Sequence, residues 1–167
     1  QRQEPAPGRT YYAGLDLARL SDFTVLSIID DEGVMVYQDR YNLLDWTVQK
    51  QRVLHDLKRY NDASCLQDST GVGDPIFDDL RRAGANIDGY KFTNESKAQL
   101  VEFLQLAFDQ QRIKILNEPV LRNELESYEY TINRSGSVSY NAPAGQHDDT
   151  VVALALAWWH RGHRAEP

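Results

Sequence analysis

The stretch GQHDDTVVALALAWWHR, residues 145–161, places two carboxylates directly before an almost entirely apolar run. The run from Val151 to Trp159 is too short to span a bilayer, and we interpret it as a buried helix. One of Asp148 and Asp149 can cap this helix, because free N–H groups and the positive end of the helix dipole lie at its start. Capping the helix requires only one of the two acids. The other carboxylate then lies beside a like charge, and a divalent cation bound there would offset the repulsion between the two.

Outward from this helix, strand and helix patterns alternate along the chain. Strands are expected first at residues 11–18, 23–30 and 34–41, where β-branched and apolar residues recur around a tight turn. Further elements follow: a helix over 46–60, a strand over 63–68, a helix around 76–83 ended by Gly84, a strand over 86–92, a helix capped by Asn94, an edge segment at 112–116, a helix opened by Pro119, and a hairpin over 128–140. We therefore predict an α/β fold with a mixed sheet, antiparallel in its first three strands and then parallel, flanked by helices.

The composition and the net charge limit the classes of function that the protein can have. The 167 residues are 41% hydrophobic and 26% charged, which is typical of one globular domain. The single cysteine, Cys65, allows no disulfide within the chain and favours a reducing, intracellular setting. A net charge of −7 argues against binding nucleic acid with the whole surface, but it allows acids gathered around a cation. We interpret residues 1–10 as a flexible linker and residues 162–167 as a flexible tail.

Two further acids fall at the ends of predicted strands. Asp16 lies between Gly14 and Ala18 on the face opposite Leu15, where an unpaired carboxylate would be costly. Asp68 ends the strand over 63–68 and precedes the glycine-containing STGVGD, which lacks P-loop spacing. Sites in α/β sheets collect at the carboxyl ends of strands, so these acids and the 148–149 pair predict a carboxylate cluster that holds a metal. The structural alternative is that each acid bonds local amides.

Three other residues are candidates beside this cluster. Asp22 follows the first strand, and it is either a turn-forming residue or a further metal ligand. Lys97 lies in the first turn of a predicted helix, where a cation opposes the dipole. It is either a solvated lysine or a contact for a phosphate or the metal cluster. His147 is a loop histidine, a ligand or a proton carrier.

The quoted motifs resemble a known family. The nuclease domain of tailed-phage terminase large subunits, which has a ribonuclease H-like fold, contains similar motifs in the same order. The four motifs of this chain are GLDLARLSDFTVL, CLQDSTGVGDPIFDDL, YKFTNESK and HDDTVVALALAWW. The resemblance covers about residues 11–161. It implies a metal-dependent endonuclease that cuts concatemeric double-stranded DNA during viral genome packaging, with little sequence specificity. It also implies that the protein acts in the cytoplasm of the infected bacterial host, at the procapsid portal.

The resemblance implies a role for each candidate residue. Asp16 would bridge two Mg²⁺ or Mn²⁺ ions, Asp68 would hold one of them, and Asp149 the other. Asp148 would support the second ion or cap the helix, and Asp22 would help to hold that ion. Lys97 matches a basic position near the site, and the hairpin around Arg134 resembles one that limits access of DNA. The expected partners of the full-length protein are an N-terminal packaging ATPase domain, the terminase small subunit and the portal.

Other functions are also compatible with the same acidic residues. A Holliday-junction resolvase or another ribonuclease H-like nuclease would share the acids but prefer branched DNA or RNA–DNA hybrids. An actin-like or sugar-kinase nucleotide domain would need glycine-rich phosphate loops, which are not evident in this sequence. A structural module would pair its acids with arginines and bind no metal.

Overall fold

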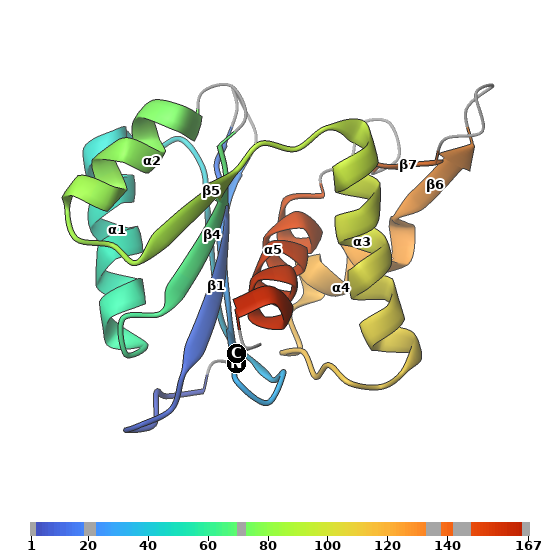
Figure 1. The fold of residues 1–167 in the computed structure, drawn as a ribbon, viewed down its shortest axis with the longest axis horizontal. Helices are drawn as coiled ribbons and strands as arrows, with labels where there is room; N and C mark the ends of the chain where they lie inside the picture. The colour runs from blue at the N-terminus through green and yellow to red at the C-terminus, as the bar shows by residue number, and fades with distance from the viewer. Residues whose placement is uncertain (1–2, 19–22, 70–72, 133–137, 142–147, 165–167) are drawn as a thin grey trace.

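A five-stranded open sheet forms the centre of the molecule (Figure 1). The computed structural model describes residues 3–18, 23–69, 73–132, 138–141 and 148–164. The sheet order is β3-β2-β1-β4-β5. The strands are β1 (Tyr11–Asp16), β2 (Thr24–Asp30), β3 (Met35–Tyr41), β4 (Ser64–Asp68) and β5 (Ile87–Tyr90).

Pairing within the sheet changes direction at β1. The pairs β1–β2 and β2–β3 are antiparallel, whereas β1–β4 and β4–β5 are parallel. The predicted mixed sheet is therefore confirmed. Because β1, β4 and β5 all run the same way, the three strands end at one edge, which we call the carboxyl edge.

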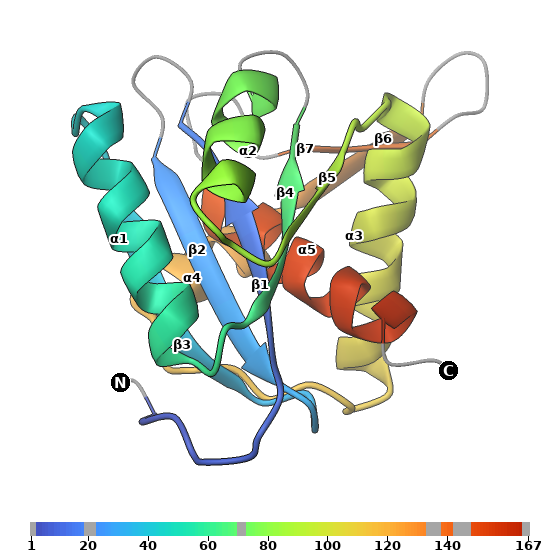
Figure 2. The same cartoon turned by 60° about the vertical axis from the view of Figure 1, so that its left-hand side comes forward.

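Helices cover both faces of the sheet (Figures 1 and 2). The helices α1 (Trp46–Arg59) and α2 (Gly73–Arg82) lie on one face. On the other face, α5 (Asp149–Arg164) packs against the strands, and α3 (Asn94–Asp109) and α4 (Pro119–Ser127) pack outside it. None of the helices in the described part of the chain has the length and apolarity needed to cross a membrane.

Strand alternation divides the core into two clusters. Tyr11, Ala13 and Leu15 of β1 face α1 and α2, whereas Tyr12 faces α5. Residues two apart share a face, so Gly14 and Asp16 also lie on the α5 side. This confirms the prediction that Asp16 points away from Leu15, and it sets the acid on the same side of the sheet as the start of α5.

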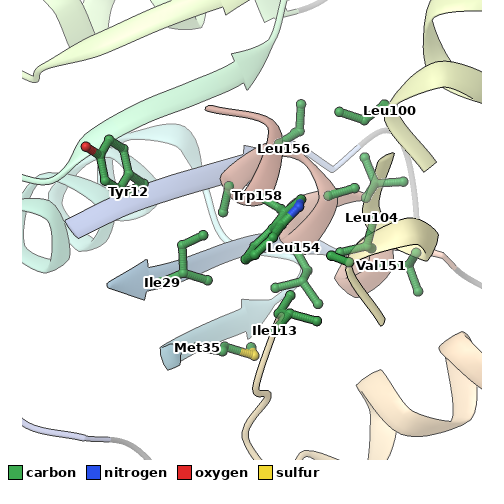
Figure 3. Packing of buried hydrophobic residues seen from close by; sticks show 14 of the residues in the cluster. Tyr12, Ile29, Met35, Leu100, Leu104, Ile113, Val151, Leu154, Leu156 and Trp158 are labelled. Carbon is green, nitrogen blue, oxygen red and sulfur yellow. The ribbon is translucent and has the colours of Figure 1, made fainter. Parts of the chain in front are cut away.

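The apolar run after Asp149 is buried almost all round, as predicted. Val151 through Trp158 are all buried, because α5 lies between the sheet and the outer helix α3. In Figure 3, Trp158 and Leu154 of α5 lie between Ile29 and Met35 of the sheet and Leu104 of α3. A helix covered on both sides needs apolar residues around its whole circumference.

The predicted hairpin is present as the pair β6 (Glu129–Ile132) and β7 (Val138–Asn141), separate from the main sheet. Its connection, with Arg134, lies outside the described residues. The segment after α3 contributes an isolated bridge between Lys114 and Val34, which fits the expected edge segment.

Several expectations need correction. Thr93, not Asn94, caps α3, because its hydroxyl accepts from the Ser96 N–H while Ser96 bonds back to the Thr93 N–H. The first strand ends at Asp16 and not at residue 18, because Ala18 N–H donates to the Thr24 hydroxyl instead of continuing the ladder.

The described residues near both ends of the chain make contacts with the rest of the fold. Gln3 N–H donates to the Val36 carbonyl, and the Tyr60 hydroxyl donates to the Gln3 carbonyl. The described part of residues 1–10 therefore makes hydrogen bonds to β3 and α1's C-cap residue Tyr60. At the other end, α5 continues to Arg164, and the His163 ring stacks on Trp159 at 4.0 Å between centroids.

Candidate metal centre at the carboxyl edge

Two of the predicted acids meet because their strands are parallel neighbours. Leu15 of β1 pairs with Gln67 of β4, and each is followed by the acid that ends its strand. Leu66 of β4 packs in the cluster beneath α5, so Asp68, two residues on, lies on that side as well. Asp16 and Asp68 therefore lie on one face of the sheet at its carboxyl edge.

Helix α5 brings the third acid to them. A Cβ atom on Gly14 would lie 2.0 Å from the Ala153 carbonyl oxygen and 2.5 Å from the Ala157 nitrogen. The helix backbone thus rests directly on β1, at a distance that only glycine permits. Its first residue, Asp149, is buried and accepts a hydrogen bond from Phe23 N–H at 3.3 Å. Asp149 lies close enough to Asp16 for its negative charge to act on the Asp16 carboxyl group.

The electrostatics of the cluster are unfavourable without a positive charge. Burial raises the pKa of the Asp16 carboxyl well above its usual range. The negative charges of Asp149, Asp148 and Asp68 raise this pKa further, in that order of effect. A proton on Asp16 would remove one of these like charges. A divalent cation would compensate the same charges without the proton.

Asp148 is held by two side chains from outside the sheet. The Lys97 ammonium donates to Asp148 Oδ2 at 3.4 Å, and the Tyr128 hydroxyl donates to the same oxygen at 3.2 Å. Burial, and then the charge of Asp148, raise the pKa of Tyr128, so its hydroxyl remains a donor. The Asp148 carbonyl accepts from Val152 N–H in the first turn of α5. Its carboxylate is thereby turned toward Lys97.

A buried acid from α4 fixes the start of α5. Glu124 Oε1 accepts from Thr150 N–H at 3.0 Å and from the Thr150 hydroxyl at 2.6 Å. Both residues are buried. Burial raises the pKa of Glu124, and the bonds from Thr150 act against that rise. Glu124 therefore satisfies one of the free N–H groups of α5 and leaves the side chain of Asp149 available to the cluster.

The structure brings most of the predicted site residues together. Asp16, Asp68, Asp148, Asp149 and Lys97 gather at the carboxyl edge, whereas Asp22 and His147 lie outside the described residues. Within the described ranges, no three carboxylate, imidazole or thiol side chains are grouped closely enough to hold a metal ion as they stand. The acids are nevertheless close enough to raise the pKa of Asp16.

Several arginines of the chain lie far from the acids of the carboxyl edge. Arg81 and Arg82 occupy the last turn of α2, which leads back to the start of β5. Arg161 donates to the Asp31 carbonyl, in the turn between β2 and β3. Both places lie opposite the carboxyl edge. Lys91 and Lys97 are near the acids, whereas Arg19 and Arg134 lie outside the described residues.

Sequence reasoning missed Tyr128, Glu124 and Thr150 as parts of the site. Thr150 directly follows the acidic pair, so its position in the sequence could have indicated that it belongs to the site. No local pattern indicates this for Glu124 and Tyr128, because α4 and its end meet α5 through tertiary packing.

An open mixed sheet with acids at the ends of adjacent parallel strands is the arrangement of the ribonuclease H-like class of proteins. A family model described as "Terminase RNaseH-like domain" matches residues 13–160. The chain therefore belongs to the terminase ribonuclease H-like domain family. The resemblance seen in the sequence motifs is confirmed.

Individual relatives agree with this assignment. The terminase large subunit of Thermus virus P23-45 is 31% identical over 154 residues, covering 91% of this chain and 32% of that protein. The chain thus spans about a third of that relative's length. The large terminase nuclease of thermophilic phage G20c, solved with bound magnesium, has a TM-score of 0.87 and 30% identity, covering 94% of this chain and 84% of that one. The HK97 bacteriophage large terminase, at 16% identity and a TM-score of 0.73, shares the fold.

Proposed function

We propose that this chain is the metal-dependent endonuclease domain of a viral DNA-packaging terminase large subunit. The observation that carries the proposal is the convergence of Asp16, Asp68 and Asp149 at the carboxyl edge of a terminase ribonuclease H-like fold. The substrate is concatemeric double-stranded DNA, hydrolysed at phosphodiester bonds with little sequence specificity. The magnesium- and cobalt-bound structures of the G20c nuclease support the binding of a divalent cation.

The donor set fits Mg²⁺ or Mn²⁺, because all the candidate ligands are carboxylates. Asp16, Asp68 and Asp149 would hold the ions. Asp148 and Asp22 would support the second ion. When bound, two such ions activate water and stabilise the leaving oxygen.

The protein's own side chains prepare this site for a charged substrate. The bond from Phe23 N–H orients Asp149, and the bonds from Lys97 and Tyr128 orient Asp148. Lys97 also supplies a positive charge beside the acids, where a DNA phosphate would approach. Contacts to backbone phosphates carry no sequence information, which accounts for low specificity.

We infer the domain organisation and partners by analogy with the family. Residues 11–161 would form the nuclease domain, with residues 1–10 leading from a packaging ATPase domain. The terminase small subunit and the portal would be partners of the whole protein. It would work in the cytoplasm of the infected bacterial host, at the procapsid portal.

The test is cleavage of supercoiled and linear plasmid with EDTA, Mg²⁺ or Mn²⁺. The Asp16→Asn variant should lose more than about a hundredfold in rate, because metal-assisted hydrolysis contributes several kcal/mol. Asp109→Asn, at the far end of α3, is the matched control and should cut normally. Equal cutting by Asp16→Asn and wild type would overturn the proposal. Preferred cutting of a four-way junction or an RNA–DNA hybrid would instead identify another ribonuclease H-like nuclease.

A further inference from the structure

An exposed pair of aromatic rings lies at the end of β5. The rings of Tyr90 and Phe92 are 4.6 Å apart between centroids, with an interplanar angle of 41°. Tyr90 is 41% exposed, and Phe92 packs against the cluster beneath α5 and α3. The outer ring is thus accessible to solvent, while the inner ring is anchored in the core. Such a pair is a firm surface for stacking another flat ring.

The register of the sheet places this pair beside the acids. Tyr90 is the direct partner of Asp68 in the parallel pair β4–β5. A Cβ atom on Gly89 would contact Phe77 of α2, so Gly89 faces α2 and Tyr90 faces the other way, as Asp68 does. Neighbouring strands lie about 4.8 Å apart, so Tyr90 is one strand from Asp68 and two from Asp16.

The flanking residues add positive charge to the aromatic surface. Lys91 lies between the two rings in sequence and is exposed. The chain then enters α3 through the Thr93 cap and reaches Lys97, which contacts Asp148. Residues 90–97 therefore connect Asp68 to Asp148 around one side of the cluster. Aromatic rings interleaved with basic residues are the usual composition of surfaces that bind unpaired nucleotides.

We propose that Tyr90, supported by Phe92, stacks against an unpaired base next to the phosphate that is cut. The inference rests on the proposed nuclease function and extends it to a substrate class: duplex DNA that is locally opened at the cut site. In an intact duplex, neighbouring base pairs cover both faces of each base, so Tyr90 has no ring to contact. At a bulge or a frayed segment one face is free. Tyr90 is a positioning residue, and Lys91 lies where it can contact the adjoining phosphate.

The experiment compares two DNA substrates, one fully paired and one with a two-nucleotide bulge that contains 2-aminopurine. Stacking on Tyr90 should quench the fluorescence of the 2-aminopurine bulge when wild-type protein binds in Ca²⁺. In Mg²⁺, Tyr90→Ala should raise KM for the bulged DNA roughly 5- to 100-fold, with kcat little changed. KM for the paired DNA should change far less. Tyr90→Phe should restore both the quenching and KM.

Leu106→Ala is the matched control, because Leu106 is also an exposed apolar residue (48%) but lies near the far end of α3. It should behave as wild type. Equal quenching by wild type and Tyr90→Ala, or equal KM changes on both substrates, would overturn the proposal and leave a protein-docking role for the pair. If the wild type cuts neither DNA, the nuclease proposal fails, but the quenching in Ca²⁺ still decides whether the base stacks on Tyr90.

Discussion

Asp16 shows how a single residue depends on its surroundings. The carboxylate sits in a strand whose other described residues are buried and uncharged, and its nearest charged neighbours are other acids. Burying such a charge is unfavourable unless a proton or a cation compensates it. Asp16 therefore lowers the stability of the folded domain unless the proposed cation binds beside it.

A second group of acids lies away from the metal centre and allows a test of pH dependence. Asp56 of α1 is buried and lies close enough to Asp39 for the charge of that carboxylate to act on it. Burial, and then the charge of Asp39, raise the pKa of Asp56 to about 6. The folded state therefore holds this proton more tightly than the unfolded state. The contribution of Asp56 to stability is greatest below pH 4 and is lost as the pH rises toward 6.

Asp56→Asn should remove this pH dependence. Asparagine has nearly the same shape as the protonated acid and carries no charge beside Asp39. We expect the variant to equal the wild type near pH 4 and to exceed it by about 1–2 kcal/mol at pH 7, measured by urea unfolding. His160, whose pKa burial lowers to about 4, gives the opposite slope over the same range, so the difference between variant and wild type is the quantity to measure. A less stable variant at pH 7 would contradict the prediction.

At the scale of elements, the contact between α5 and β1 positions the site. The start of α5 carries Asp149, and the end of β1 carries Asp16. The separation of the two acids depends on how closely the helix rests on Gly14. Glu124 of α4 fixes the same end of α5 through Thr150. Packing and a buried hydrogen-bonded link therefore act together to define the position of Asp149.

Gly14→Ala should disturb this contact severely. The added methyl group would meet backbone atoms of α5, which cannot move aside as a flexible side chain can. We expect a loss of about 3 kcal/mol or more in unfolding free energy, together with weaker metal binding. The matched control is Gly89→Ala in β5, where a Cβ meets only side-chain atoms at 3.2–3.3 Å. Similar unfolding midpoints for the two variants would show that α5 can shift at little cost.

At the scale of the whole molecule, the carboxyl edge concentrates negative charge in a protein that is already acidic. The net charge is −7, and the described acids of the cluster lie beside one another at this edge. A cation that binds only the folded state should therefore stabilise the entire domain.

Mg²⁺ or Mn²⁺ should raise the melting temperature. At a hundredfold excess over Kd, the gain is about 2.7 kcal/mol, or about 5–10 °C for a domain of this size. Asp16→Asn should melt higher than the wild type without metal, because it removes a buried charge from among like charges. It should show little further rise when metal is added. Equal metal-induced shifts in both proteins would show that the cation binds elsewhere.

Much of the fold could be predicted from local patterns. Period-two alternation placed Asp16 on the face opposite Leu15, and the apolar run after Asp149 predicted a buried helix; the structure confirms both. The order of strands and helices predicted the mixed sheet. The errors fell at boundaries: Thr93 caps α3, the first strand ends at Asp16, and α5 extends to Arg164. Such ends depend on individual hydrogen bonds, which periodicity does not encode.

The sequence by itself determined which residues can take part in the site, because acids at strand ends and at a helix start are local features. Only the tertiary structure decided how they meet. Lys97 and Asp148 are 51 residues apart, and Phe23 and Asp149 are 126 apart, yet each pair is hydrogen-bonded. The placement of Tyr90 beside Asp68 likewise required the pairing of β4 with β5. Contacts over such separations follow from the packing of whole elements, whose geometry no local pattern of residues specifies.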